Sequence, residues 1–427
     1  SMAAMTAFAH AMSAVCIKVL EECPKNYKKS PVLWWWGGYG GGKTWLLEQM
    51  QYFYGDFSKA PTINARGSYK SKIAVCHHYR HAYMFYDDNK EALSKDSGND
   101  MKSFVQSAYD RNIISAMKRD GDLREKPTRA RGQVAITSED PLSNESSAIS
   151  RTISIDVDLA MDQEKGNRVL SKRHLYSGFT PYVIKHVLNL DKLTVAEMWD
   201  AAYAKIFQGS ENAQDRSGAH RLSENLSMNY LGMQVAIDTM IGNGGISIID
   251  AENILKQHMT NLKIIKTQML HAVKKARGSQ VFIDELKQLL ADPTKYKIFG
   301  WPGTDSEATS RAHVLGFLRS KDPGVVYLNP ELAYQAVATA MRAKNSTPQS
   351  KPQIARQLAE DGYFVEELCN RKDRRYTVKR SDPSRIQQDV YPLRAEVLGL
   401  VVDGQSDVLR VQFNNNSFSN DDFRLEQ

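Results

Sequence analysis

Residues 37–44 constrain the fold of this chain more than any other segment. They read G-G-Y-G-G-G-K-T and match G-x-x-x-x-G-K-T, the pattern of a phosphate-binding loop. An apolar run typical of a buried strand, residues 32–36, precedes the loop, and a run typical of a helix begins at Thr44. A strand that leads through a glycine-rich turn into a helix directs backbone N–H groups and the positive end of the helix dipole at one point. A glycine-rich turn that matched by chance would not need these flanks, so the sequence predicts an α/β nucleotide-binding core.

The loop predicts ATP and Mg²⁺ as cofactors. We expect Lys43 to reach the β- and γ-phosphates and the Thr44 hydroxyl to ligate Mg²⁺. The backbone that would surround the phosphates comes from glycines, which have no Cβ to block the approach: Gly37, Gly40, Gly41 and Gly42.

A second motif lies 44 residues after Lys43, where the apolar residues 82–86 end in Asp87 and Asp88. At the end of a buried strand, Asp87 could hold Mg²⁺ through water, and Asp88 could polarise the water that attacks the γ-phosphate. The alternative is an ordinary strand end. The spacing from the loop, with one predicted helix between, favours the catalytic interpretation.

Residues 113–131 are strongly basic around the hairpin signal Asp120-Gly121. A protruding basic hairpin suits contact with a phosphate backbone, and a solvated surface hairpin is the alternative. The basic residues named for DNA contact are Lys118, Arg119 and Arg124, with Lys126, Arg129 and Arg131 nearby.

Two further strands complete the predicted core. Residues 133–138 read as a buried strand whose polar end, Thr137, Ser138 or Glu139, could contact the γ-phosphate or its water. Arg151 opens the next strand. An isolated arginine is usually a surface charge, but in a ring ATPase an arginine here reaches the nucleotide of the neighbouring subunit.

The order of these motifs resembles that of the AAA+ helicases of superfamily III and the related replicative helicases of phages, plasmids and mobile islands. The resemblance covers about residues 5–160: residues 37–44 match motif A, Asp87 and Asp88 motif B, and residues 134–139 motif C, while Arg151 lies where the family has its arginine finger. It implies a homo-oligomeric ring, a hexamer, with single-stranded DNA in its channel. Two departures are the missing asparagine sensor of motif C, where Ser138 or Glu139 stands, and the missing Lys-His pair at the hairpin tip.

The rest of the chain reads as helices followed by a mixed module. Residues 3–23 form an amphipathic helix, expected as an N-terminal collar, and residues 161–275 are mostly helical, with breaks at 178–181 and 242–245 and a long helix over 250–275. Arg216 and Arg221 could approach nucleotide from this region or be surface charges.

The C-terminal pattern predicts a winged-helix-like module. We expect strands at 280–283, 324–328, 363–368 and 375–379, and helices at 284–290, 311–318, 330–342 and 353–360. The loop of the last two strands is basic and could touch phosphates, or it could be a solvated turn or a subunit contact. Its residues are Arg371, Lys372, Arg374 and Arg375.

The predicted architecture is therefore α/β: an AAA+ P-loop ATPase core with an N-terminal helix before it and a helical region and a winged-helix-like C-terminal module after it. The expected domains are a collar (1–30), the core (31–160), a helical region (161–275), the winged-helix-like domain (276–384) and a tail with possible strands (385–427). Ser1-Met2 resembles a remnant of tag cleavage, so the chain is expected to be part of a longer protein.

Composition excludes several classes of protein. None of the four cysteines forms a C-x-x-C pair, so zinc ribbons and disulfide frameworks are unexpected. Cys76, His77, His78 and His81 lack a spacing suited to zinc. No run of 18 apolar residues exists, so we expect no membrane span. The cysteine pattern fits a reducing cytoplasm, which is the expected location. The formal charge of +7 suits a polyanionic partner.

The function predicted from these features is an ATP-driven helicase or translocase on DNA, in the replication of a phage or mobile element. Two alternatives stay open. One is a DNA-dependent motor of packaging or transposition type that does not unwind, and the other is a regulatory P-loop NTPase that switches a protein contact.

Overall fold

The computed structural model describes most of the chain, in two compact units, Ser1–Lys274 and Lys275–Gln427. The described residues are 1–23, 27–57, 63–65, 68–89, 95–111, 128–142, 146–157, 163–209, 216–300, 313–319, 321–322, 324–344, 346, 348–369, 376–381 and 387–399.

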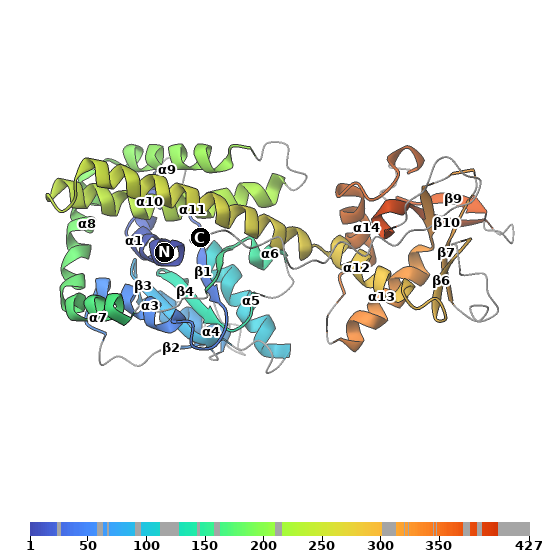
Figure 1. Ribbon diagram of the computed structural model, residues 1–427, viewed down its shortest axis with the longest axis horizontal. Coiled ribbons are helices and arrows are strands. Elements are labelled where there is room, and N and C mark those ends of the chain that lie inside the picture. The colour runs from blue at the N-terminus through green and yellow to red at the C-terminus, as the bar shows by residue number, and fades with distance from the viewer. Residues whose placement is uncertain are drawn as a thin grey trace, which may run out of the picture. The chain divides into compact units, whose positions relative to one another are not determined.

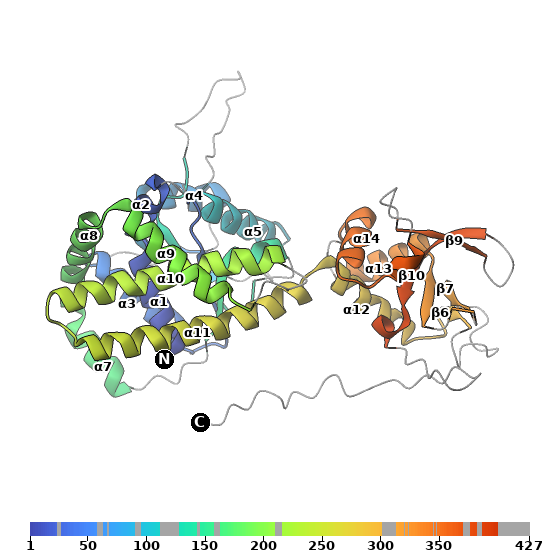
Figure 2. The same ribbon diagram turned by 90° about the horizontal axis from the view of Figure 1, so that it is seen from above.

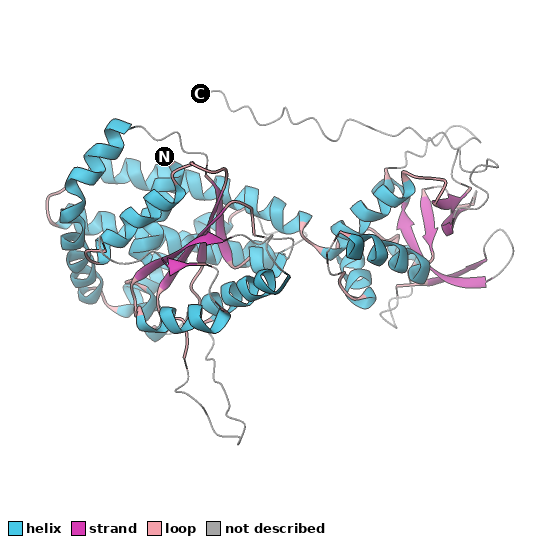
Figure 3. Cartoon of the chain, turned by 90° about the horizontal axis from the view of Figure 1, so that it is seen from below, coloured by secondary structure: helices cyan, strands magenta, loops and turns pink. Residues whose placement is uncertain are grey.

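The first unit is built on a five-stranded parallel sheet of strand order β2-β3-β4-β1-β5 (Figure 1). Helices pack on both of its faces (Figure 3). Parallel strands covered on both faces are rich in apolar residues, which is why the apolar runs at 32–36 and 134–136 predict β1 and β4. The strands are β1 (Val32–Trp36), β2 (Ile63–Asn64), β3 (Tyr83–Asn89), β4 (Gln133–Ser138) and β5 (Thr152–Asp156).

The sheet separates two layers of the core. One face carries Trp34, Met84 and Ile136 and packs on α4 and α5. The other face contacts α1 and α3. Trp34 and Trp35 are fully buried, as expected of core residues. The helices of this part are α3 (Lys43–Gln51), α4 (Tyr69–His78), α5 (Lys95–Asp110) and α6 (Ser146–Ile149).

A helical layer closes the first unit (Figure 2). Helix α1 packs against α10 and α11 through Ala9, Met233 and Ala251. Asn229 Nδ2 donates to the Thr6 carbonyl at 3.0 Å, and the His10 ring bonds the Pro31 carbonyl at 2.9 Å. The N-terminal helix is thus held between sheet and helical layer. The helices are α1 (Met2–Ser13), α2 (Ile17–Glu22), α7 (Gln163–Lys172), α8 (Phe179–Asn189), α9 (Lys192–Phe207), α10 (Arg216–Gly242) and α11 (Ile248–Lys275), with 3₁₀ segments η1 (Tyr52–Tyr54) and η3 (Arg173–Gly178).

Most predicted elements of the first unit are confirmed. Ser68 caps α4 by accepting from the Ser71 N–H, and the break at residues 242–245 separates α10 from α11. The single helix predicted over 3–23 is wrong in one respect, because residues 14–16 form a turn between α1 and α2. The predicted break at 178–181 is the start of α8.

The second unit has a five-stranded mixed sheet of order β6-β7-β8-β10-β9, in which β6 and β7 are parallel and the other neighbours antiparallel. Its core joins this sheet to three helices through residues such as Phe282, Val326 and Leu358. The elements are α12 (Gly278–Leu290), β6 (Tyr296–Phe299), β7 (His313–Leu318), β8 (Val325–Leu328), α13 (Pro330–Ala343), α14 (Lys351–Glu360), η5 (Glu366–Leu368), β9 (Val378–Ser381), β10 (Gln387–Arg394) and η7 (Ala395–Leu398).

Several predictions for this unit are wrong. The strand predicted at 280–283 is part of α12, and the helix predicted at 311–318 is strand β7 where it is described. Residues 363–368 contain one bridge, Phe364 to Leu393, and then η5, instead of a strand. The hairpin partner of β9 is β10, so the strands predicted to flank the basic loop do not pair with each other.

Among the helices that the structure describes, none combines the length and apolar character needed to cross a membrane.

Candidate nucleotide-binding site

The phosphate-binding loop lies at the carboxyl end of β1, directly before α3. Gly37 has φ +142°, and a Cβ built there would lie 2.6 Å from the Val157 carbonyl oxygen. The Val157 N–H in turn donates to the Trp36 carbonyl at 2.8 Å, so the chain after β5 runs against the base of the loop. A side chain at Gly37 would therefore have to displace backbone. Gly42, with φ +70°, precedes Lys43, the first residue of α3.

The amino end of α3 faces the space enclosed by the loop. The first N–H groups of a helix lack partners within the helix, and the helix dipole places positive charge beside them. The Lys43 ammonium donates to the Gly37 and Gly38 carbonyls, at 2.7 Å each. The loop thus holds a cation and helix N–H groups in one place, which suits a polyphosphate.

Asp87 lies beside this helix and receives two hydroxyl groups. Its Oδ1 accepts from Thr44 Oγ1 at 2.8 Å and from Thr137 Oγ1 at 2.5 Å. This is possible because β4 lies between β1 and β3, so the ends of three neighbouring strands meet at one edge. The structure therefore brings the predicted metal ligands Thr44 and Asp87 together.

The arrangement suits Mg²⁺. A hydroxyl oxygen and a carboxylate oxygen at 2.8 Å are hard oxygen donors of the kind this ion takes. Mg²⁺ usually uses one or two protein oxygens and completes its shell with phosphate oxygens and water, so Thr44 and Asp87 are enough.

The other residues predicted near the γ-phosphate are placed differently. Asp88 follows Asp87 in β3, and its side chain is outside the described part of the structure. Ser138 is buried and accepts from the Asp140 N–H at 3.2 Å, while Glu139 is exposed. Successive residues of a strand point to opposite faces, so Thr137, and not Ser138, reaches the Asp87 carboxylate.

Glu48 was missed in the sequence. It lies one helical turn after Thr44, on the same face of α3. Burial raises the pKa of its carboxyl, the Asp87 charge raises it further, and Arg173 opposes both. The Arg173 guanidinium lies 4.3 Å from the centre of the Tyr52 ring. The i, i+4 spacing from Thr44 was the signal that could have found this second carboxyl group beside Asp87.

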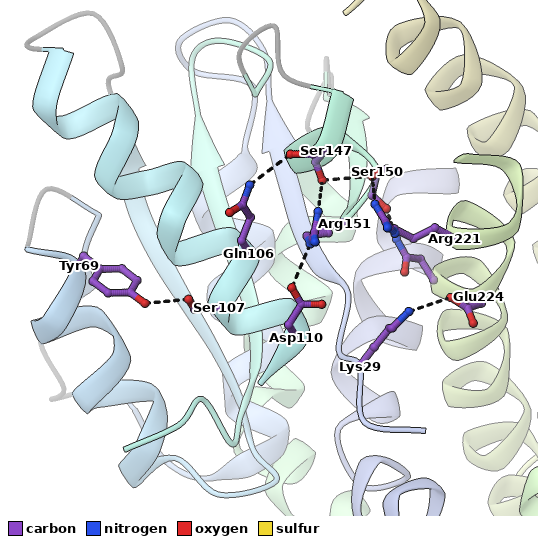
Figure 4. Close-up of polar contacts among 11 residues, drawn as sticks. Lys29, Tyr69, Gln106, Ser107, Asp110, Ser147, Ser150, Arg151, Arg221 and Glu224 are labelled. Atoms are coloured by element: carbon purple, nitrogen blue, oxygen red, sulfur yellow. Dashed lines mark hydrogen bonds and ion pairs between the residues drawn. The ribbon is translucent and has the colours of Figure 1, made fainter. Parts of the chain in front are cut away.

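Arg151 lies at the other edge of the sheet. It directly precedes β5, whose pairing with β1 matches Val32 to Thr152 and Trp36 to Asp156. Its guanidinium contacts Asp110 at 3.3 Å and donates to the Ser147 carbonyl at 2.8 Å (Figure 4). The loop, by contrast, follows the carboxyl end of β1, so Arg151 and the loop of the same subunit are separated by the length of the strand.

Arg221 joins the same network from α10. Its Nη1 donates to Ser150 Oγ at 2.9 Å, and Asn225 of the same helix donates to the Ser150 carbonyl at 3.0 Å (Figure 4). Arg221 therefore lies beside Arg151, away from the loop of its own subunit. The side chain of Arg216 is outside the described part.

The basic residues predicted to contact DNA fall outside the described residues, in both the hairpin and the C-terminal loop. They are Lys118, Arg119, Arg124, Arg371, Lys372, Arg374 and Arg375. Cys76 is buried and contacts the Tyr86 hydroxyl, and His77 Nδ1 lies 3.2 Å from the Arg129 N–H. No group of three or more possible metal-ligating side chains occurs among the described residues.

Comparison with known proteins gives a likeness in structure but none in sequence. No family model matches the sequence, and no curated protein matches it. A solved structure described as "SCCmec type IV Cch - active helicase" superposes with a TM-score of 0.64. The two sequences are 14% identical, and the match covers 93% of this chain and 68% of the other. At this identity the likeness shows a shared fold.

Proposed function

We propose that this chain is an ATP-driven DNA helicase or translocase of the AAA+ class, similar to superfamily III, that acts in the replication of a phage or mobile element. The observation that carries the proposal is the placement of Asp87 between the Thr44 and Thr137 hydroxyls beside a complete phosphate-binding loop. The fold shared with an active helicase supports it. Such an enzyme would work in the cytoplasm of a bacterial or host cell.

The residues of one subunit would bind and orient ATP. The loop N–H groups and Lys43 would hold the phosphates, and Thr44 and Asp87 would hold Mg²⁺, which when bound offsets phosphate charge. Asp88 would accept a proton from the attacking water. Thr137 would keep Asp87 in place, directly before Ser138 and Glu139, which stand where the family has its sensor.

A neighbouring subunit would complete the site. Strands rise about 3.3 Å per residue, so the loop and Arg151, at opposite ends of paired strands, are separated by roughly 16 Å. An arginine so placed cannot serve the nucleotide of its own subunit, but it can serve that of the next subunit in a ring. We therefore propose a homo-hexameric ring with single-stranded DNA in its channel.

The first test is ATP hydrolysis with and without single-stranded DNA, together with the mass in solution and an unwinding assay. We expect DNA to stimulate hydrolysis, and Lys43→Ala to abolish both hydrolysis and unwinding. Stimulation by duplex without strand separation would favour a packaging or transposition motor. Slow hydrolysis at a rate that DNA does not change would favour a regulatory P-loop NTPase that switches a protein contact.

A second test mixes two inactive variants. Arg151→Ala keeps its phosphate-binding loop, and Lys43→Ala keeps its arginine. If Arg151 acts in trans, random mixing restores a complete site at roughly a quarter of the interfaces, so hydrolysis returns. No recovery, with both variants still assembled, would show that Arg151 only supports the fold.

A further inference from the structure

Two short segments, residues 76–82 before β3 and residues 128–132 before β4, form a platform at the amino edge of the first sheet. The Arg131 N–H donates to the Cys76 carbonyl and the His81 N–H to the Arg131 carbonyl, at 3.1 Å each. The Arg129 N–H donates to His77 Nδ1 at 3.2 Å. Both segments precede strands, β3 and β4, whose other ends carry Asp87 and Thr137. The platform and the nucleotide site therefore lie at opposite edges of one sheet.

Close backbone contact brings the two segments together. A Cβ at Gly132 would lie 2.6 Å from the Tyr79 carbonyl oxygen and 2.9 Å from that of Ala82. His81 has φ +55°, an unusual conformation for a residue with a side chain, and its N–H bond to the Arg131 carbonyl holds it there. The side chains that flank these positions, Arg80 and Arg131, are thereby brought close to each other.

The platform concentrates positive charge. The Arg131 guanidinium has its pKa lowered by partial desolvation and then by the positive charges of Arg80 and Arg129, against which Glu21 acts. Arg80 and His78 are exposed, and the Arg129 side chain is 34% exposed. Like charges at close range repel one another, so a site of this kind gains when an anion binds.

The acid beside the platform does not neutralise it. Glu21 is buried and pairs at 2.8 Å with the buried Arg111, whereas its distance to the Arg129 guanidinium is 3.8 Å. Arg111 also donates from Nε to the Ala130 carbonyl at 3.2 Å, which ties the Glu21 pair to the backbone of the platform. Glu21 is thus shared by Arg111 and Arg129, so one carboxylate stands against four guanidinium groups and the surface of Arg80, Arg129 and Arg131 keeps a net positive charge.

We propose that Arg80, Arg129 and Arg131 form a binding surface for the phosphate backbone of DNA. Guanidinium groups bind phosphate through paired N–H groups, and a rigid backbone lowers the entropy lost when they do so. Arg129 and Arg131 end the predicted basic hairpin segment 113–131, and Arg80 adds to them a charge from the segment before β3, outside that hairpin. This inference rests on the proposed function, because it identifies where the motor would bind the DNA along which it moves.

The test is binding of a fluorescent single-stranded oligonucleotide, followed by anisotropy at several salt concentrations. Arg80→Ala and Arg131→Ala should each weaken binding about 5- to 10-fold and lower the slope of log affinity against log salt by about 0.7 per lost phosphate contact. The double variant should be weaker than either. Arg80→Lys, which keeps the charge, should retain most of the slope.

A matched control removes an exposed charge elsewhere. Lys185→Ala, on α8, should bind DNA as the wild type does. Thermal unfolding of each variant separates loss of binding from loss of fold, and Arg80 is exposed, so its replacement should leave the unfolding temperature unchanged. The affinity for a duplex of equal length is measured beside that for the single strand. Whichever form the wild type binds more tightly, a loss of that affinity in the arginine variants supports the proposed binding surface.

Three outcomes would overturn the inference. If the wild type binds DNA and the arginine variants bind equally well, the platform does not bind DNA, while the proposed function stands. If polyglutamate of matched charge displaces the oligonucleotide equally well, the surface recognises acidic chains and not a phosphate backbone. If the wild type neither binds DNA nor responds to it in hydrolysis, the proposed function fails, and the platform with it.

Discussion

The Thr137 hydroxyl donates to the Asp87 carboxylate at 2.5 Å, onto the same oxygen atom that accepts from Thr44. Asp87 is therefore fixed from two sides, by the strand next to its own and by the helix that follows the phosphate-binding loop. A carboxylate with two such donors has little freedom to turn. Its position depends on the strand order, which places β4 between β1 and β3.

Replacement of Thr137 by valine should slow ATP hydrolysis. The change keeps the branched shape of the side chain and removes the hydroxyl, so Asp87 loses one of its two supports. Small displacements of a positioning group can cost up to about 100-fold in rate, and we expect a loss of about 10- to 100-fold with ATP affinity largely kept. Steady-state hydrolysis and equilibrium binding of a fluorescent ATP analogue would measure the two effects separately.

Ser138→Ala serves as the comparison. Its hydroxyl accepts from the Asp140 N–H and does not reach Asp87, so its loss should slow hydrolysis much less than Thr137→Val does. A larger effect of Ser138→Ala would favour Ser138, which with Glu139 stands at the family's sensor position, and would contradict the role given to Thr137.

Gly37→Ala should distort the loop, whereas Gly38→Ala should not. A Cβ at Gly37 would meet the Val157 carbonyl at 2.6 Å with φ at +142°, while one at Gly38 has no neighbour within 4 Å among the described residues. We expect Gly37→Ala to lower the free energy of unfolding by about 1–3 kcal/mol and to weaken ATP binding. Gly38→Ala should stay within about 0.5 kcal/mol. Denaturant unfolding of both variants tests this, and equal stabilities would contradict it.

Glu21→Gln should lower the free energy of unfolding far more than Glu22→Gln does. The side chains of Glu21 and Arg111 are buried, at 2.8 Å from each other, and burial lowers the pKa of Arg111 to about 10 although Glu21 raises it. Removal of the carboxylate charge leaves a buried guanidinium without its partner, a change that costs about 3–5 kcal/mol in other proteins. The free energy of unfolding should fall accordingly.

Glu22→Gln is the matched control for that change. Glu22 is exposed and pairs with Lys18 and Lys192, contacts that hold the pKa of its carboxyl at about 2. Solvent screens such pairs, so we expect little change in stability. If the two variants unfold alike in denaturant, the buried pair contributes no more than the surface one.

The first unit should become less stable as the pH falls, because His10 is held neutral in the fold. Burial lowers the pKa of this imidazole to about 4, although its bond to the Pro31 carbonyl acts in the other direction. Between about pH 6.5 and pH 4 the unfolded chain binds a proton that the folded chain excludes, so stability is complete above 6.5 and is lost as pH falls toward 4. His258, also lowered to about 4 by burial, adds a change of the same sign.

His10→Gln isolates the contribution of His10. The glutamine amide can still donate to the Pro31 carbonyl but does not titrate, so the unfolding temperature should depend less on pH between 4 and 6.5. An unchanged slope in His10→Gln would show that the imidazole is not held neutral in the fold.

The sequence was most informative where local pattern and burial agree. Strands β1 and β4 are buried on both faces, so β1 reads as an unbroken apolar run and β4 has an apolar middle, residues 134–136. The loop between β1 and α3 matches a pattern specific to phosphate binding. The neighbourhood of Thr44 and Asp87 could be predicted from their motifs. The contact of Thr137 could not, because it depends on strand order, and neither Thr137 nor Ser138 carries a sign of which face it points to.

The second unit shows the opposite situation. Residues 281–283 are apolar, and two of them are β-branched, yet Phe282, Ile283 and Leu286 are buried at helical spacing in α12. A short apolar run does not distinguish a strand from a buried helix. Strand β7 is fixed by pairing with β6 on one side and β8 on the other, and β9 by pairing with β10. Such long-range partners are absent from any local window of sequence.

The contact between α1 and α10 also bears on how the chain is made. Thr6 and Asn229, which join these helices, are 223 residues apart. At the speed of a ribosome, roughly 5–20 residues per second, α1 emerges roughly 10–45 s before its partner. During that time the face of α1 that carries Ala9 has no α10 or α11 to cover it. A chain shortened after β5 would keep every motif of the nucleotide site and yet leave this face in water permanently, so it should aggregate where the longer chain folds.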